Sequence, residues 1–271
     1  METVDLAPYL RRIEFTGSLR PDLAMLTALH LAHATHIPFE NLDVLLQRSI
    51  AIDLPSIEKK LIENRRGGYC FEQNTLFAAV LEQLGFSVKR LGARVLMGAT
   101  EPRPRTHMLL LVTADREQWL SDVGFGGEGL LLPLRFRAGE EANSFGWKSR
   151  IIQQDNHYFL QSLRPEGWFT LYTFTLEEHF PIDYEVANHY TATHPDSHFT
   201  RMLIAQLPGT GQRVRLTNRR FTVETPTGLI EDREIPTDEE LVDVLANNFG
   251  IALPQGTRFP IPMGPTREPR A

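Results

Sequence analysis

Residues 65–74, RRGGYCFEQN, join a glycine pair to the start of a helix. Apolar residues follow it at helical spacing, at Leu76, Phe77, Val80, Leu81 and Leu84. A glycine pair lets the chain turn sharply, so this pattern predicts that Cys70 lies in the first helical turn. There the unpaired backbone N–H groups and the helix dipole stabilise a thiolate, which is the nucleophilic form of cysteine.

Cys70 is the only cysteine, so the sequence predicts no internal disulfide and no cysteine-rich zinc site. A free cysteine is most often a small buried hydrophobic residue, and position alone leaves that interpretation as strong as the catalytic one. The glycine turn, the helix start and the polar neighbours Glu72, Gln73 and Asn74 favour a nucleophile.

Outward from this stretch, residues 5–85 carry a helical pattern, and residues 86 to about 180 change to the two-residue period of strands. Helices are expected at residues 21–35 and 55–64 and from Cys70 to Gly85. Strands are expected at residues 88–97, 108–112, 119–123, 150–154, 158–163 and 168–174. Many short antiparallel strands in succession indicate a barrel or a sandwich.

The last third of the chain mixes both periods. A short helix is expected at residues 182–189, with strands at 202–207, 213–216 and 220–224. Thr237 opens a capping box for a further helix, which Gly250 ends. The proline-rich tail from Pro254 is expected to be extended.

Composition excludes several classes of protein. Lysine and arginine number 28 against 34 aspartate and glutamate residues, so the net charge of −6 argues against a nucleic-acid partner. No apolar run approaches the ~20 residues of a membrane helix, so no membrane partner is expected. The first residues, METVD, lack the features of a signal peptide, and we therefore expect a cytoplasmic protein.

A catalytic thiolate needs a base, and nine histidines compete for that role. His30, His33 and His36 have a spacing that suggests a metal site. However, no carboxylate or cysteine completes a ligand set at helical spacing, so surface or packing roles are favoured.

His107 differs from these histidines because it lies at the start of the apolar strand expected at residues 108–112. Asp122 lies near the end of the strand expected at residues 119–123. Neighbouring antiparallel strands place the end of one beside the start of the other. Asp122 is equally interpretable as a turn residue before glycines. The turn that contains Gly124, Gly126 and Gly127 could hold a phosphate on its amides, but it matches no established phosphate-binding motif.

Several segments together resemble the arylamine N-acetyltransferases. Residues 66–74 resemble the active-site signature of that family, and residues 37–42, IPFENL, resemble its second signature. Residues 106–108 and 121–126 resemble its histidine and aspartate segments. Residues 190–199, YTATHPDSHF, resemble the segment that lies near coenzyme A. The five segments occur in the order of the family.

The resemblance implies an α+β fold of three domains: a helical bundle over residues 1–85, an antiparallel β-barrel over 86–190 and an α/β lid over 191–271. It also implies a triad like that of cysteine proteases, in which Cys70 is the nucleophile, His107 its base and Asp122 the group that orients the imidazole. The expected activity is ping-pong transfer of acetyl from acetyl-CoA, through an acetyl-cysteine thioester, to arylamines, arylhydrazines and N-hydroxyarylamines. No metal is expected.

Further site residues are expected from the same resemblance. The expected contacts to coenzyme A are Thr106, Gly124, Phe125, Gly126, Gly127, Tyr190 and Ser197. The expected walls of a flat acceptor pocket are Phe39, Tyr69, Phe125 and Phe199. Glu40 and Arg66 are expected to form a structural ion pair. His194 and Asp196 depart from the family pattern beside the expected cofactor segment.

Three alternatives remain open from sequence. An amide synthase of polyketide macrolactams would keep the triad and take its acyl group from a carrier protein. A Cys-His-Asp hydrolase would resolve the acyl-enzyme with water. A non-catalytic binding protein is disfavoured because Cys70, His107 and Asp122 all occur in matching segments. A monomer and a homodimer are equally compatible with the sequence.

Overall fold

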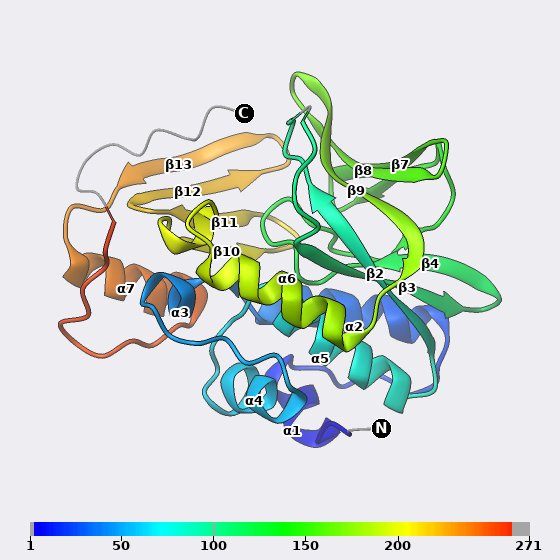
Figure 1. Cartoon of the computed structure of the whole chain (residues 1–271), viewed down its shortest axis with the longest axis horizontal. Coiled ribbons are helices and arrows are strands. Elements are labelled where there is room, and N and C mark those ends of the chain that lie inside the picture. The colour runs from blue at the N-terminus through cyan, green and yellow to red at the C-terminus, as the bar shows by residue number, and fades with distance from the viewer. Residues whose placement is uncertain (1–2, 100, 262–271) are drawn as a thin grey trace.

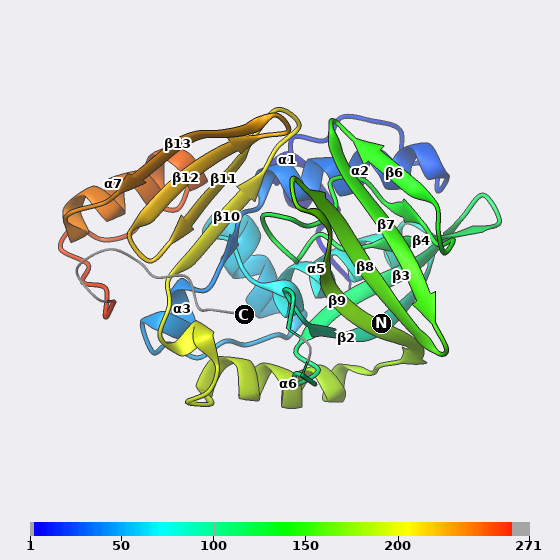
Figure 2. The ribbon, with the colours of Figure 1, turned by 90° about the horizontal axis from the view of Figure 1, so that it is seen from above.

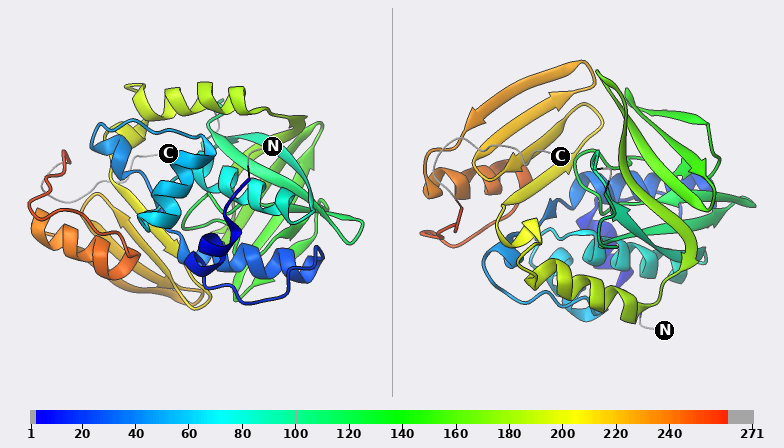
Figure 3. Two further views of the ribbon diagram at one scale, coloured as in Figure 1. Left: turned by 90° about the horizontal axis from the view of Figure 1, so that it is seen from below. Right: turned by 45° about the horizontal axis from the view of Figure 1, so that its top comes forward.

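The computed structural model describes residues 3–99 and 101–261. Its first part is helical, as the sequence predicts. It consists of α1 (Leu6–Arg12), α2 (Leu23–His36), α3 (Leu42–Leu45), α4 (Leu54–Ile57), a π-helical turn (Glu58–Glu63) and α5 (Cys70–Gln83). Asp22 caps α2 and Asp53 caps α4, each by accepting a backbone N–H three residues ahead. The blue and cyan helices cover the underside of the molecule in Figure 3.

An antiparallel sheet of eight strands forms the second part and curls into a nearly closed barrel (Figure 2). Its strands are β2 (Ser87–Val95), β3 (His107–Ala114), β4 (Glu117–Ser121), β5 (Leu134–Arg135), β6 (Glu141–Ser144), β7 (Trp147–Gln154), β8 (His157–Arg164) and β9 (Gly167–Glu178). They run in the order β5-β4-β3-β2-β9-β8-β7-β6. An isolated bridge pairs Ala138, which follows the edge strand β5, with Ile151 of β7, next to the opposite edge strand β6.

A second antiparallel sheet has five strands in the order β1-β10-β11-β12-β13. These are β1 (Phe39–Glu40), β10 (Ile204–Pro208), β11 (Arg213–Thr217), β12 (Arg220–Thr225) and β13 (Gly228–Glu234). The helix α7 (Asp238–Phe249) contributes Leu241 and Leu245 to the apolar core of this sheet. Figure 1 shows the two sheets side by side, with α6 (Pro181–Thr193) running in front. A 3₁₀ turn (His198–Thr200) connects α6 to β10.

The pairing of β1 with β10 joins the helical first part to the second sheet. Phe39 lies opposite Gln206, and Glu40 lies opposite Ala205. This contact spans more than half of the chain, and the sequence does not predict it because a two-residue strand has no measurable period. It brings the segment before the glycine pair next to the last third of the chain.

The expected helices and strands are confirmed, with boundaries that differ by a few residues. The strand expected at residues 88–97 ends at Val95, and the one expected at 119–123 ends at Ser121. The capping box is confirmed, since Thr237 accepts the Glu240 N–H at 3.1 Å. Residues 254–261 of the tail form no helix or strand, and the rest of the expected extended tail lies outside the described residues.

Within the described ranges, no helix is long and apolar enough to cross a membrane. The cytoplasmic location and the three domain boundaries stay predictions.

Candidate active site

The glycine pair before Cys70 is required by close packing. A side chain at Gly67 would collide with the Pro38 carbonyl oxygen. A Cβ atom at Gly68 would lie 2.7 Å from Glu72 Oε2. Because neither residue carries a side chain, the backbone approaches Pro38 closely enough for the Gly68 N–H to donate to the Pro38 carbonyl at 3.2 Å.

The helix α5 begins at Cys70, as the sequence predicts. Tyr69 precedes it in an extended conformation, and its N–H donates to Glu72 Oε2 at 3.1 Å. A carboxylate at this position satisfies one of the free N–H groups at the start of the helix. Cys70 therefore occupies the first helical turn, where the backbone stabilises negative charge.

Cys70, His107 and Asp122 come together from α5, the start of β3 and the end of β4. His107 Nε2 donates to Asp122 Oδ2 at 2.7 Å, and the Cys70 thiol donates to the Thr106 carbonyl at 3.6 Å. Only 4% of Cys70, 3% of His107 and 1% of Asp122 is exposed. Charges so far removed from water interact strongly.

The electrostatics of the pair follow from this burial. Burial alone would lower the pKa of His107, but the Asp122 carboxylate and the interaction with Cys70 outweigh it and raise that pKa to about 10. Burial would raise the pKa of Asp122, but His107, Asn74 and the Gly124 N–H hold it below its usual value. The pair is therefore an imidazolium and a carboxylate at neutral pH.

Asn74 lies one helical turn after Cys70 and fixes the Asp122 carboxylate. Its Nδ2 donates to Asp122 Oδ1 at 3.0 Å and to the Met108 carbonyl at 2.7 Å. Its Oδ1 accepts the Val123 N–H at 3.1 Å. From sequence, Asn74 is predicted only to be a polar neighbour of Cys70. The four-residue spacing from Cys70 is the signal that could have assigned it to the site.

The turn after Asp122 contacts Cys70 directly. The Gly124 N–H donates to Asp122 Oδ1 at 3.0 Å, and a Cβ atom at Gly124 would lie 2.7 Å from Cys70 Cα. A side chain at Gly126 would collide with Gln206, and the Gly127 N–H donates to the amide oxygen of Gln206 at 2.6 Å. Two amides of the turn expected to hold a phosphate are thus already bonded within the protein.

The aromatic residues expected to line the acceptor pocket fall into two clusters. Phe199 contacts Phe39 and Tyr69, with ring centroids 6.0 and 5.9 Å apart. Tyr69 is fully buried, and its hydroxyl donates to the Asn188 side chain of α6. The ring of Tyr69 therefore packs inside the protein, against α6.

Phe125 belongs to the second cluster. Its ring meets the His107 ring edge to face at 5.3 Å and the ring of Tyr172 at the same distance. Tyr172 also contacts His107, with ring centroids 5.0 Å apart. Tyr172 is a further residue of this region that the sequence does not single out, because nothing local distinguishes it from the other residues of its strand. Phe125 is half-buried and adjoins the His107 imidazole.

Three other residues expected near coenzyme A already have partners. The ring of Tyr190 stacks on His194 at 4.4 Å. The Ser197 hydroxyl donates to the Thr191 carbonyl at 2.6 Å and so closes the end of α6. Thr106 presents its carbonyl to Cys70.

The expected Glu40–Arg66 ion pair is confirmed and is part of a larger cluster. Arg66 contacts Glu40 at 2.6 Å and Asp43 at 3.3 Å. Lys60 contacts Asp43 at 2.9 Å and Glu72 at 2.7 Å. We call these five side chains the glycine-turn network, because they surround the turn at Gly67 and end on the cap of α5.

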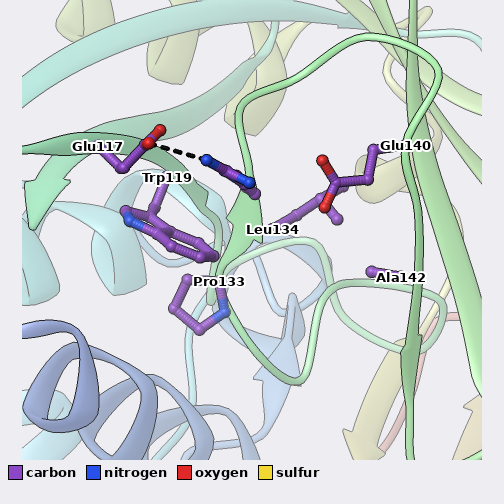
Figure 4. A pocket seen from close by; sticks show the side chains of 7 residues that line it. Glu117, Trp119, Pro133, Leu134, Glu140 and Ala142 are labelled. Carbon is purple, nitrogen blue, oxygen red and sulfur yellow. Dashed lines mark hydrogen bonds and ion pairs between the residues drawn. The ribbon is translucent and has the colours of Figure 1, made fainter.

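A surface hollow of about 370 Å³ lies elsewhere on the barrel (Figure 4). Its lining residues are Glu117, Trp119, Pro133, Leu134, Arg135, Glu140 and Ala142. None of these seven was expected in the site, and Glu117 is already paired with Arg135 at 2.8 Å. In residues 3–99 and 101–261, no group of three or more metal-ligating side chains could hold a metal ion.

Comparison with known proteins points to one family. A family model described as N-acetyltransferase matches residues 22–258. The arylamine N-acetyltransferase of Escherichia coli is 40% identical over 248 residues, which cover 90% of this chain and 88% of that protein. An arylamine N-acetyltransferase of Mycolicibacterium smegmatis is 39% identical and covers 92% of this chain and 93% of its own length.

Solved structures agree with these sequence matches. The arylamine N-acetyltransferase of Salmonella typhimurium superposes with a TM-score of 0.87 at 38% identity, covering 92% of both chains. The Mycobacterium marinum enzyme in complex with CoA superposes with a TM-score of 0.87 at 34% identity, covering 91% of this chain and 93% of its own.

Proposed function

This chain belongs to the arylamine N-acetyltransferase family and transfers acetyl from acetyl-CoA to arylamines, and we propose that Cys70, His107 and Asp122 carry out the reaction. The observation that carries this assignment is the buried 2.7 Å contact between His107 and Asp122 beside Cys70. It supplies a polarised imidazole next to a thiol at a helix start, which is what a thiol nucleophile requires.

In the first half-reaction, Cys70 reacts as a thiolate beside the His107 imidazolium, and its sulfur attacks the carbonyl carbon of the acetyl-CoA thioester. The bond from that carbon to the sulfur of coenzyme A breaks, and His107 gives its proton to the leaving thiolate. The products are free coenzyme A and acetyl-Cys70. One thioester replaces another, so this step is close to balanced in free energy and is reversible.

In the second half-reaction, the amine nitrogen of the acceptor attacks the carbonyl carbon of acetyl-Cys70. His107, now neutral, takes the proton that the amine loses as the new C–N bond forms. The carbon–sulfur bond breaks and restores the Cys70 thiolate beside the imidazolium. Asp122 stays ionised throughout and keeps the imidazole nitrogen that faces Cys70 free to accept a proton.

The acceptor and the cofactor meet this triad along the turn after Asp122. Phe125 adjoins the His107 ring, which supports its assignment as one wall of the acceptor site. Phe39, Tyr69 and Phe199 pack against one another in the same apolar cluster as Cys70. Arylhydrazines and N-hydroxyarylamines present the same kind of nucleophilic atom on a flat ring and are acceptors of the same class.

Coenzyme A binds beside the turn at residues 124–127, with Thr106, Tyr190 and Ser197 nearby. The proximity of Gly124 to Cys70 supports this assignment, as does the relative from Mycobacterium marinum, whose structure contains CoA. Gly124 and Gly127 serve by allowing close approach, since their amides bond within the protein.

Intact-protein mass spectrometry tests the proposal. Wild-type protein mixed with acetyl-CoA should gain one acetyl group, Cys70→Ala should gain none, and an arylamine should discharge the adduct. Lasting acetylation of Cys70→Ala would show that another residue carries the acetyl group. No adduct together with rapid iodoacetamide labelling of Cys70 would keep the triad but require a different acyl donor. The relatives do not favour the macrolactam-forming alternative.

A further inference from the structure

Three consecutive backbone N–H groups follow the end of β4, and each is accepted by a side chain. The Asp122 N–H donates to His30 Nε2 at 3.2 Å, the Val123 N–H to Asn74, and the Gly124 N–H to Asp122 itself. β4 ends at Ser121 because these groups bond to side chains instead of to another strand. Of the three acceptors, only His30 comes from α2.

The contacts of His30 determine which of its nitrogens carries hydrogen. Its Nδ1 lies 3.1 Å from the Leu131 carbonyl, which can only accept, so Nδ1 is protonated. Its Nε2 is therefore the unprotonated nitrogen and accepts the Asp122 N–H. Burial, opposed by Leu131 and Asp122, lowers the pKa of His30 to about 4, so the ring is neutral at physiological pH.

We infer that His30 is a positioning residue for acetyl transfer: its ring ties the Asp122 backbone to Leu131 and so holds the Asp122 carboxylate in reach of His107. This inference rests on the proposed function. It adds a residue outside the triad and the cofactor and acceptor contacts. The backbone of Asp122 is fixed by His30, and its carboxylate is fixed by Asn74.

His33 provides a matched control on the same helix. Both histidines are fully buried, and both meet the Phe77 ring nearly edge to face, at 5.8 Å for His30 and 5.2 Å for His33. His33 hydrogen-bonds the Tyr9 hydroxyl at 3.0 Å, within the helical part of the protein. A role in packing alone predicts the same outcome for both residues, and a positioning role does not.

The test compares His30→Leu, His30→Gln, His30→Asn and His33→Leu with wild type. Gln places an acceptor where Nε2 reaches Asp122, whereas the shorter Asn reaches only toward Leu131. The first readout is the single-turnover rate of Cys70 acetylation by acetyl-CoA. The second is the pH dependence of Cys70 labelling by iodoacetamide, which needs no acetyl donor. Urea unfolding reports the stability of each variant.

We expect His30→Leu and His30→Asn to slow acetylation about tenfold, the effect of one lost buried hydrogen bond. Their labelling profiles should shift to higher pH, because a displaced Asp122 supports the imidazolium less well. His30→Gln should recover most of the rate, and His33→Leu should lose stability while keeping the wild-type rate and profile.

Wild-type acetylation and labelling profiles in His30→Leu and His30→Asn would overturn the inference and leave His30 as a packing residue. If His30→Leu does not fold, equal rates and profiles for the Gln and Asn variants would overturn it in the same way. If wild type is not acetylated at all, the proposed function fails, and the iodoacetamide profiles alone still decide the role of His30.

Discussion

Two buried clusters of charge lie on either side of the junction between Tyr69 and Cys70. On one side, His107 and Asp122 form a pair of one cation and one carboxylate. On the other, the glycine-turn network shares three carboxylates between Lys60 and Arg66. Both are removed from water, and in both the partner charges hold the cation in its protonated form.

The difference lies in which protons can move. Burial opposes protonation of Lys60, but Glu72, Glu40 and Asp43 raise its pKa above its already high usual value, so it stays charged at neutral pH. His107 has a pKa near 10 and faces a thiol, so reaction at Cys70 can remove its proton and return it. We infer that the network supports the helix start and that the pair alone carries chemistry.

A substitution in the His107–Asp122 pair should slow the reaction more than any other change. Asp122→Asn removes the negative charge and lets an amide N–H face His107 Nε2, which favours the imidazole form that cannot accept a proton from Cys70. We expect single-turnover acetylation to slow about 10³- to 10⁴-fold, as for an equivalent change in a serine protease triad. Asp115→Asn, in the exposed β3–β4 turn, should keep the wild-type rate. A loss below tenfold in Asp122→Asn would remove Asp122 from the mechanism.

Lys60→Met should break the glycine-turn network and affect the stability of the fold more than the rate of acetylation. It leaves the nearly fully buried Glu72 without its cation, and the free energy of unfolding should fall by about 3–5 kcal/mol. Lys59→Met changes an exposed neighbour and should stay within about 0.5 kcal/mol of wild type. Urea unfolding measures both. Acetylation per folded molecule should change far less than in Asp122→Asn, and a comparable loss would show that the two clusters act as one.

The pH dependence of stability separates the clusters further. The pKa of His107 is 6.5 in the unfolded chain and about 10 in the fold, so its protonation stabilises the fold fully below pH 6.5 and this contribution disappears as the pH rises toward 10. The stability difference between wild type and His107→Gln should therefore shrink over that range. Lys60 is charged in both states throughout it, so the difference caused by Lys60→Met should stay nearly constant. Parallel changes in the two differences would contradict the assignment.

What could be predicted from sequence follows from the range of the interactions involved. The glycine pair, the helix start at Cys70 and the hairpins of the barrel depend on neighbours in the chain, and local rules identified them. The strands β1 and β5 have two residues each, which is too short for a period. All seven residues of β13 are exposed, so its sequence does not alternate between apolar and polar.

The candidate site shows the same division. Local position made Cys70, His107 and Asp122 candidates, and the resemblance to the family was needed to group them as a triad. His30 and the Asp122 N–H are 92 positions apart, and on its own helix His30 resembles any packed polar ring. Lys60 and Glu72 likewise appear as ordinary helix-surface charges until the glycine turn brings them together. Contacts between distant segments are set by packing, which a single sequence does not display.

A change at Phe125, which contacts His107, should alter the choice of acceptor and should have the weakest consequence of the changes considered. Phe125 meets the His107 ring at 5.3 Å. Phe125→Ser should open this side of the site and change the preference between bulky and small arylamines by about tenfold, the size of one lost apolar contact. The measurement is kcat/KM for a series of arylamines of increasing ring size. Phe145→Ser, at an exposed loop phenylalanine, is the control and should leave the ranking as it is. Because acetylation of Cys70 involves no arylamine, the first half-reaction should change less than the second. An unchanged ranking would show that Phe125 supports the imidazole without bordering the acceptor.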